Sequence, residues 1–278
     1  MSSHAPGLGT REKKHNAFQL YVTVPSMCAA PLASKISYAE GTVLPLAIST
    51  AAAGLYLPGL LGLPLPSATL QSDSDRRKHT LLVWGAASSV GSTTVQLALS
   101  SGVEVFATAS KRNFDFVKSL GVDNVFDYSE PDVVKNIVTA LKDRQTKLVG
   151  VYDAIGLNDT VRKSAEILKA VEGKGLVASV LDPPGDLPDG IAAKSCMSLV
   201  LLRVEAYLSG LVIALAIFYE HPEIGKAVWK NFVPEALETG RLKTKPDPVV
   251  VGKGLDKVQD GFDKLKAGVS AKKVVVEL

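Results

Sequence analysis

The chain has 278 residues, of which 46% are hydrophobic and 21% charged, and its formal net charge is +3. A chain of this length can bury a full-sized core, as two domains or as one large α/β unit. So small a charge gives no support to a nucleic-acid partner. Only Cys28 and Cys196 occur, without His or Cys at ligand spacing, which disfavours a disulfide framework and a structural zinc.

Two stretches bear on targeting and membranes. Residues 1–18 carry charges but no apolar run after them, so they do not indicate a secretory signal, and a cytoplasmic location is the default expectation. The most hydrophobic stretch, 195–220, is interrupted by Arg203 and Glu205. Its uninterrupted part, 206–218, is well short of the roughly 20 residues that a spanning helix needs. We therefore predict no membrane span, and interpret the stretch as buried structure or a subunit interface.

Strand-like and helix-like patterns alternate through the middle of the chain. Short apolar or β-branched runs predict strands at 80–85, 103–110, 124–128, 147–156 and 173–181. Helical spacing and glycine stops predict helices from 90 to Gly102, over 113–121, from Pro131 onward and over about 158–171. This alternation predicts an α/β fold with right-handed βαβ units and a doubly wound parallel (Rossmann) sheet. Ligands of such sheets bind at the carboxyl ends of the strands.

The first predicted strand is joined to its helix by GAASSVG, residues 85–91. A helix N-terminus offers unpaired N–H groups and partial positive charge to a phosphate, and small residues let a pyrophosphate approach the backbone. Gly85 and Gly91 stand six apart with Ser88 between them, so the G-x-G-x-x-G pattern is incomplete. The loop alone is compatible with a phosphate site and with a tight turn that binds nothing.

The end of the second predicted strand bears on the choice of nucleotide. An Asp or Glu about 20 residues past the loop suits the ribose 2′-hydroxyl of NADH, whereas cations there suit a 2′-phosphate. This strand is followed by Ser110, Lys111 and Arg112, without an acid. Taken with the loop, these residues favour NADPH over NADH, although a solvated surface turn explains the basic pair equally well.

Four blocks of the sequence resemble one known family. They are AEGTVLPLAISTAAAGLY (39–56), VWGAASSVGSTTVQLA (83–98), FATASKRNFDFVKSLGVDNVFDY (106–128) and the stretch from KPDPVVVGKG to the final VVVEL (245–278). They look like the zinc-independent medium-chain dehydrogenase/reductases, in the branch of quinone oxidoreductases and fungal trans-enoyl reductases. The resemblance runs from about Ala17 onward.

The resemblance implies an NADP(H) site, assembled from segments far apart in the chain. The pyrophosphate loop would be Ala87, Ser88, Ser89, Val90 and Gly91, and the 2′-phosphate segment Ser110, Lys111, Arg112 and Asn113. Tyr128 would lie beside the adenosine, Val180 and Leu181 would form the nicotinamide wall, Ser270 and Ala271 would return to the cofactor, and Thr50 would line the substrate cleft. No metal is expected.

Several of these residues also have a plain structural interpretation. Tyr128 can be a half-exposed aromatic at a strand end, and Ser270 a turn residue before the last strand. Asp153 and Gly156 are interpreted as strand-end residues and are left outside the site. Tyr207 and His221 are available as acids, but nothing around them raises them above structural residues, so no catalytic acid is assigned.

The resemblance also implies a domain division and a reaction. Residues 1–48 would be the last part of a GroES-like catalytic domain, so the chain is expected to be truncated or spliced at its amino end. Residues 49–220 would form the NADP-binding Rossmann domain, and 221–278 would rejoin the catalytic part. In the implied reaction NADPH delivers hydride to the β-carbon of an α,β-unsaturated carbonyl compound or to a quinone.

Two function classes remain open at this point. One is an active enoyl or quinone reductase, with a homodimer paired through the 195–218 stretch or a polyketide synthase as possible partners. The other is an incomplete NADPH-binding or oligomer-forming remnant of the family. The sequence has no G-x-S-x-G elbow, no Tyr-x-x-x-Lys and no P-loop, which disfavours α/β-hydrolases, short-chain dehydrogenases and P-loop NTPases.

Overall fold

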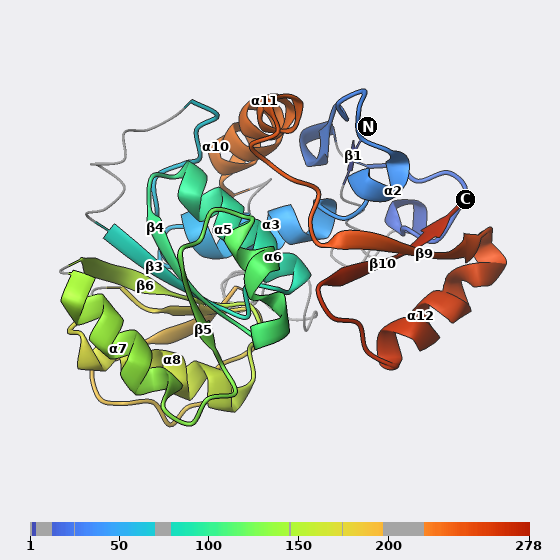
Figure 1. Cartoon of the computed structure of the whole chain (residues 1–278). Coiled ribbons are helices and arrows are strands. Elements are labelled where there is room, and N and C mark those ends of the chain that lie inside the picture. The colour runs from blue at the N-terminus through green and yellow to red at the C-terminus, as the bar shows by residue number, and fades with distance from the viewer. Residues whose placement is uncertain are drawn as a thin grey trace.

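The computed structural model describes residues 2–3, 13–24, 26–69, 79–144, 146–173, 175–196 and 220–278. Its centre is a six-stranded sheet with helices on both faces, as Figure 1 shows. The strands are all parallel and lie in the order β5-β4-β3-β6-β7-β8. They are β3 (His79–Trp84), β4 (Glu104–Ala109), β5 (Asn124–Asp127), β6 (Lys147–Asp153), β7 (Val177–Ser179) and β8 (Ala193–Ser195).

The strand order confirms the predicted fold class. Counted from β3, it is the 3-2-1-4-5-6 order of a doubly wound Rossmann sheet, in which successive strands are added first on one side of β3 and then, from β6 onward, on its other side. Such a reversal leaves a crevice at the carboxyl ends of the two strands. The loop after β3 and the loop after β6 therefore flank the place where this fold binds ligands.

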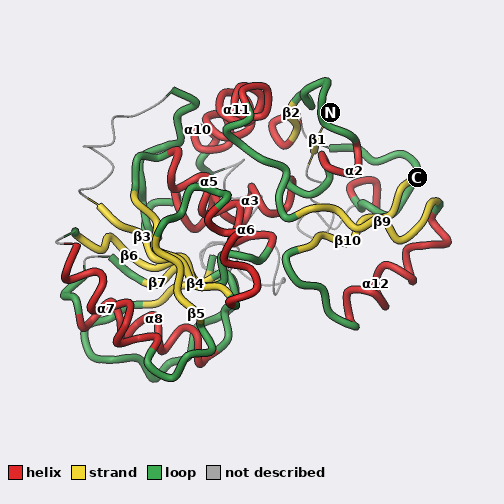
Figure 2. Tube along the Cα trace, in the orientation of Figure 1, coloured by secondary structure: helices red, strands yellow, loops and turns green. Residues whose placement is uncertain are grey.

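The side chains of β3 point alternately into two hydrophobic cores, one on each face of the sheet. Leu81 and Val83 are fully buried on one face of the sheet, and Leu82 and Trp84 are buried in the core of the other face. The first face is covered by α3 (Pro45–Tyr56), α5 (Ser89–Ser100) and the short α6 (Phe114–Lys118), and the second by α7 (Val133–Arg144) and α8 (Asn158–Ala170). Figure 2 shows the strands as a yellow layer between these red helices. Because it is buried on both faces, β3 is apolar almost throughout.

Most predicted elements exist, with shorter bounds. The helix expected over 113–121 opens as a 3-10 turn, Lys111–Asn113, and becomes helical only over Phe114–Lys118. The strand expected over 173–181 pairs only at Val177–Ser179. Strand β8 was not expected, because its three residues are too few to show a strand pattern. Most of the predicted interface stretch, together with Tyr207, falls in 197–219, outside the described residues.

The carboxy-terminal residues form a separate small layer. Strands β9 (Asp247–Lys253) and β10 (Lys272–Glu277) pair in parallel, and α12 (Val258–Lys266) connects them. Figure 1 shows this unit beside the main sheet, near α2 (Tyr38–Gly41). The turn from α12 into β10 and the start of β10 bring Ser270 and Lys273 back to the main sheet, as the contacts below show. The segment from Ser270 to Lys273 therefore contacts the elements that follow β3 and β4.

The remaining elements are short. They are β1 (Ser2–Ser3) and β2 (Ala29–Ala30), the 3-10 turns Lys13–His15, Ser26–Cys28 and Leu255–Lys257, and a helical run made of α10 (Pro222–Gly225), a π-helix (Lys226–Phe232) and α11 (Val233–Thr239). Among them, β2 and the helical run that contains α11 pack on the core of the first face. Within the described part of the chain, no helix is both long and apolar enough to cross a membrane. The predicted domain boundaries at 48/49 and 220/221 stay predictions.

Candidate functional site

The predicted pyrophosphate loop forms the turn between β3 and α5. Ser88 is the N-cap of α5, and its hydroxyl oxygen accepts a hydrogen bond from the backbone N–H of Gly91 at 3.0 Å. The N–H groups of Ser89 and Val90 lie in the same first turn, where no carbonyl of the helix can accept from them. The first turn contains no acidic residue. Ser88 thus has a capping role that a glycine at this position could not perform, and the helix end remains suited to an anion.

Gly91 holds the helix tightly against the strand. A Cβ atom built on Gly91 would lie 2.2 Å from the carbonyl oxygen of Gly85 and 2.9 Å from the Cα of Ala86, both of them backbone atoms. Gly85 itself has a φ of 79°, in the left-handed region that glycine adopts without strain. The two glycines that remain of the incomplete fingerprint therefore serve the turn geometry and the close helix–strand contact.

Lys273 reaches this helix end from β10, and it was not in the predicted site. Its Nζ donates to the Ser89 hydroxyl at 3.4 Å, and burial lowers the pKa of its ammonium group. Among the described residues no carboxylate lies within ion-pair distance of it, whereas its neighbour Lys272 pairs with Asp247 at 3.0 Å. The only sequence signal was its place three residues after Ser270.

The surroundings of Lys273 fit a phosphate group. A helix N-terminus carries partial positive charge, so a half-buried ammonium beside it is repelled, and burial of the ammonium adds a desolvation cost. An anion between the two would be attracted by both. The donor set that faces this spot, a lysine with backbone amides and serine hydroxyls, is typical of sites that bind pyrophosphate.

The predicted 2′-phosphate segment follows β4. Ser110 precedes the 3-10 turn, Lys111 and Arg112 are exposed, and the side-chain amide of Asn113 donates to the Ser110 hydroxyl oxygen at 3.0 Å and to the Ser270 hydroxyl oxygen at 3.1 Å. Two segments that the sequence assigned to one cofactor are therefore in direct contact. Ala271, the other predicted residue of the returning segment, has a φ of 47°, an uncommon conformation for a residue other than glycine.

The end of β5 adds an aromatic ring and a carboxylate to this edge. Tyr128 is 43% exposed, and its backbone N–H donates to the carbonyl of Ala109 at the end of β4. Asp127 was not considered from the sequence. Bonds from the hydroxyl and the backbone of Ser129, and then the amide and charge of Lys111, hold the pKa of its carboxyl below the usual value. Asp127 is thus a carboxylate beside the basic pair, on the strand next to the one where an acid was sought.

The predicted nicotinamide wall lies across the crevice, after β7. Leu181 is 47% exposed, and the N–H of Val180 donates to the backbone carbonyl of Asp153. Gly156 has a φ of 74°, and a Cβ there would lie 2.8 Å from both the backbone nitrogen and the Cβ of Leu181. The turn after β6 therefore packs directly against the wall.

Asp153 organises that turn. Its side chain has no exposure to solvent. One carboxylate oxygen accepts the N–H groups of Ile155 and Gly156, each at 2.9 Å, and the other accepts the hydroxyl of Thr160 at 2.6 Å. Burial raises the pKa of the Asp153 carboxyl, and these three bonds oppose that effect. From the sequence, Asp153 was interpreted as a strand-end residue and left outside the site. In the structure its carboxylate fixes the turn that packs against Leu181.

Thr50 lies on α3, and its side chain bonds within its own helix. Its hydroxyl donates to the backbone carbonyl of Leu46 at 2.9 Å, and its own carbonyl accepts the Tyr152 hydroxyl at 2.9 Å. Tyr152 is fully buried on β6, so this second bond anchors α3 to the sheet. The role of Thr50 in a substrate cleft stays a prediction.

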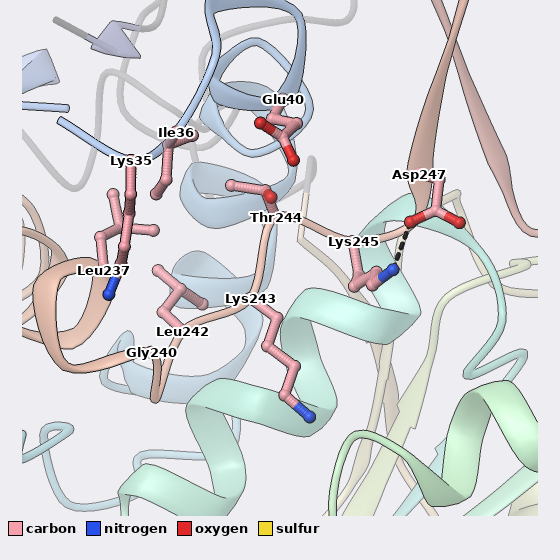
Figure 3. A pocket seen from close by; sticks show the side chains of 10 residues that line it. All are labelled: Lys35, Ile36, Glu40, Leu237, Gly240, Leu242, Lys243, Thr244, Lys245 and Asp247. Carbon is pink, nitrogen blue, oxygen red and sulfur yellow. Dashed lines mark hydrogen bonds and ion pairs between the residues drawn. The ribbon is translucent and has the colours of Figure 1, made fainter. Parts of the chain in front are cut away.

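A separate surface pocket contains none of the predicted site residues. It has a volume of about 220 Å³ and lies where α2 meets the segment after α11. Figure 3 shows the ammonium groups of Lys35 and Lys243 pointing away from its centre, and they donate to the carbonyls of Glu238 and Ser119, each at 2.5 Å. Lys245 is paired with Asp247. Because these charged groups already have partners within the protein, the pocket is not a second candidate site.

The matched family profile, described as zinc-binding dehydrogenase, covers residues 89–204. Among the described residues, no three His, Cys, Asp or Glu side chains are grouped so that they could hold a metal ion. The chain is 39% identical over 275 residues to the trans-enoyl reductase himH of Aspergillus japonicus, an alignment that covers 99% of this chain and 72% of that protein.

Solved structures share the fold. An alcohol dehydrogenase superfamily protein from Novosphingobium aromaticivorans superposes with a TM-score of 0.64 at 20% identity, covering 92% of this chain and 69% of the other. The quinone oxidoreductase of Thermus thermophilus, solved alone and with NADPH, gives a TM-score of 0.59 at 20% identity, covering 95% and 74%. Together with the extended match to the trans-enoyl reductase, the Rossmann strand order identifies this chain as a member of the medium-chain dehydrogenase/reductase family of oxidoreductases, in the branch that contains fungal trans-enoyl reductases.

Proposed function

We propose that this protein binds NADPH and reduces an enoyl compound or a quinone. The observation that carries the proposal is the half-buried Lys273 at the N-terminus of α5, where the helix end and the ammonium group would both attract an anion. The family supplies the type of cofactor, a nicotinamide nucleotide. The trans-enoyl reductase relatives support the substrate class, and the basic pair after β4 supports the phosphorylated form of the nucleotide.

Each part of the cofactor has residues that would hold it. The pyrophosphate would lie between Lys273 and the first turn of α5, formed by Ala87, Ser88, Ser89, Val90 and Gly91. The 2′-phosphate would lie between Ser110, Lys111, Arg112, Asn113 and the returning Ser270 and Ala271, with the adenosine against Tyr128. The nicotinamide would rest on Val180 and Leu181. Bound there, NADPH would supply the hydride for the reduction.

The protein's own contribution to the reaction is chiefly geometric. The turn fixed by Asp153 would keep Leu181 in place, so that the apolar wall holds one face of the nicotinamide and excludes water from it. Asp153 itself is not a proton donor, because its oxygens are occupied by three donors. The proton that the enolate takes up is therefore not assigned to Asp153.

A binding and turnover experiment tests the proposal. Purified protein is titrated with NADPH and NADH, with nicotinamide fluorescence as the readout, and NADPH oxidation is then followed with enones and quinones. We expect tighter binding of NADPH than of NADH, and turnover with at least one substrate class. Binding without turnover would leave an NADPH-binding remnant of the family, and no binding would refute the cofactor assignment. Tighter binding of NADH would refute the role of the basic pair.

The cellular location and the partners of the protein are also part of the proposal. We propose that the protein acts in the cytoplasm, either as a homodimer or beside a polyketide synthase, which would be the source of its enoyl substrate. Size-exclusion chromatography coupled to light scattering would measure the oligomeric state directly. A monomer at working concentration would refute the homodimer.

A further inference from the structure

Asn113 links the main sheet to the carboxy-terminal segment. It precedes α6 at the N-cap position, where asparagine commonly bonds to the helix, yet its side chain makes no capping bond. The side-chain nitrogen donates instead to the Ser110 and Ser270 hydroxyl oxygens, at 3.0 and 3.1 Å. An amide nitrogen carries two hydrogens, so these two bonds use its full donor capacity.

This arrangement leaves both serine hydroxyls able to donate. Each hydroxyl oxygen accepts a hydrogen from Asn113, and among the described residues neither hydroxyl donates a bond of its own. A hydroxyl has one hydrogen, which remains available for another acceptor. Two such hydroxyls are thus held about one nitrogen, beside Lys111 and Arg112, on the edge where the 2′-phosphate is proposed to bind.

The Ser270 side of this contact is held in an uncommon backbone conformation. Gly268 and Ala271 have φ values of 91° and 47°, so the segment turns sharply on either side of Ser270. Conformations of this kind persist where surrounding contacts support them. The bond to Asn113, which lies 157 residues earlier in the chain, is one such contact.

We propose that Asn113 is a positioning residue that aligns Ser110 and Ser270 as a pair of donors to the 2′-phosphate, and that the carboxy-terminal segment thereby takes part in selecting NADPH over NADH. The inference rests on the proposed function, because it requires the nucleotide to bind at this edge. Asn113 acts through the two hydroxyls and not as a phosphate ligand, since both of its amide hydrogens are already donated. A nucleotide without the 2′-phosphate gains nothing from this arrangement.

The test compares 2′,5′-ADP, which carries the extra phosphate, with 5′-AMP, which does not. Calorimetric titration of the full chain is carried out on N113A, S270A and the double variant N113A/S270A. Each single variant should bind 2′,5′-ADP about tenfold more weakly, as expected for the loss of one hydrogen bond to a charged group, with 5′-AMP affinity unchanged. The double variant should lose clearly less than the product of the single losses, because the two residues act through one contact.

Two controls separate positioning from general damage. S270T keeps the hydroxyl and should retain most of the affinity for 2′,5′-ADP. N136A removes a comparable amide from α7, where Asn136 bonds to Glu130 at 3.4 Å, and should change neither affinity. Thermal unfolding of every variant checks that the fold is retained.

The possible outcomes distinguish this inference from the proposed function. Wild-type protein that binds NADPH while S270A binds 2′,5′-ADP normally would overturn the inference and leave the function standing. Equal losses of 2′,5′-ADP and 5′-AMP affinity, or fully multiplicative losses in the double variant, would overturn it as well. Wild-type protein that binds none of these nucleotides would overturn both.

Discussion

Replacing Lys273 with methionine should stabilise the free protein and weaken its binding of NADPH. Methionine keeps the length and apolar stem of the lysine but removes the buried ammonium from the N-terminus of α5. Most substitutions at a half-buried position destabilise a protein. A stabilising effect coupled to a loss of affinity is therefore the signature of a charge held for a ligand.

The two magnitudes follow from the contacts of Lys273. Repulsion between a cation and a helix N-terminus costs about 0.3–1 kcal/mol, and relief of burial adds to it, so the K273M variant should gain about 1 kcal/mol in the free energy of unfolding. A hydrogen bond to a charged group contributes about 1.5–3 kcal/mol. NADPH should therefore bind about 10- to 150-fold more weakly.

The matched control is the K272M variant. Lys272 is the next residue along β10, and it is exposed and paired with Asp247. Loss of such a surface pair costs at most about 1 kcal/mol, and NADPH affinity should not change. Urea unfolding gives the stabilities, and fluorescence titration gives the affinities. A K273M variant that is less stable than wild type and binds NADPH as well would refute the reasoning.

The stability difference should also depend on pH. Burial lowers the pKa of Lys273 in the folded protein, whereas the unfolded chain keeps the ordinary lysine value of about 10.4. Between these two values the unfolded state binds more protons, so wild-type stability rises with pH across that window. The advantage of K273M should be fully present below the lowered pKa of Lys273 and shrink as the pH rises from there to the ordinary lysine value.

Three further predictions concern the turns and the basic pair. G91A should lose about 3 kcal/mol of stability in urea unfolding, because its Cβ would meet backbone atoms. The control G185A has open space around its Cβ and should stay within about 0.5 kcal/mol of wild type. Equal stabilities of the two variants would contradict the close helix–strand contact. D153A should lower the free energy of unfolding by about 3 kcal/mol, because it leaves buried donors without an acceptor, and D153N should lower it less, because it keeps one acceptor oxygen. Urea unfolding measures both values. A larger loss in D153N than in D153A would exclude the assigned role of the carboxylate. The double variant K111A/R112A should lower the ratio of NADPH to NADH affinity at least about tenfold at low salt. Titration with both nucleotides measures this ratio. An unchanged ratio would show that Lys111 and Arg112 do not select the nucleotide.

The sheet and its layers were predictable because their signals are local. The apolar run that became β3, the helical spacing after Gly91 and the regular alternation that follows each depend on a short window of sequence. Strand β8 was missed because its three residues, Ala193–Ser195, carry no pattern of their own. They form a strand only because β7 offers an open edge.

The site was predictable only where a resemblance connected distant segments. Ser270 could be paired with Ser110 because the family places both at the cofactor, and Asn113 now joins them. Lys273 meets Ser89 across 184 residues, and no local pattern marks that meeting. Asp153 looked like an ordinary strand end because its role depends on the donors of Ile155, Gly156 and Thr160, whose arrangement exists only in the folded turn.

The return of β10 to α5 also sets the order in which the site is completed during synthesis. The main sheet ends with β8 at Ser195, whereas Ser270 and Lys273 follow α12 and leave the ribosome later. A nascent chain can thus close its six-stranded sheet while the proposed phosphate-binding edge still lacks its ammonium group and one serine hydroxyl. The proposed nucleotide can stabilise this protein through those contacts only after β10 has emerged, so it would act after the main sheet has formed and not on the early folding of that sheet.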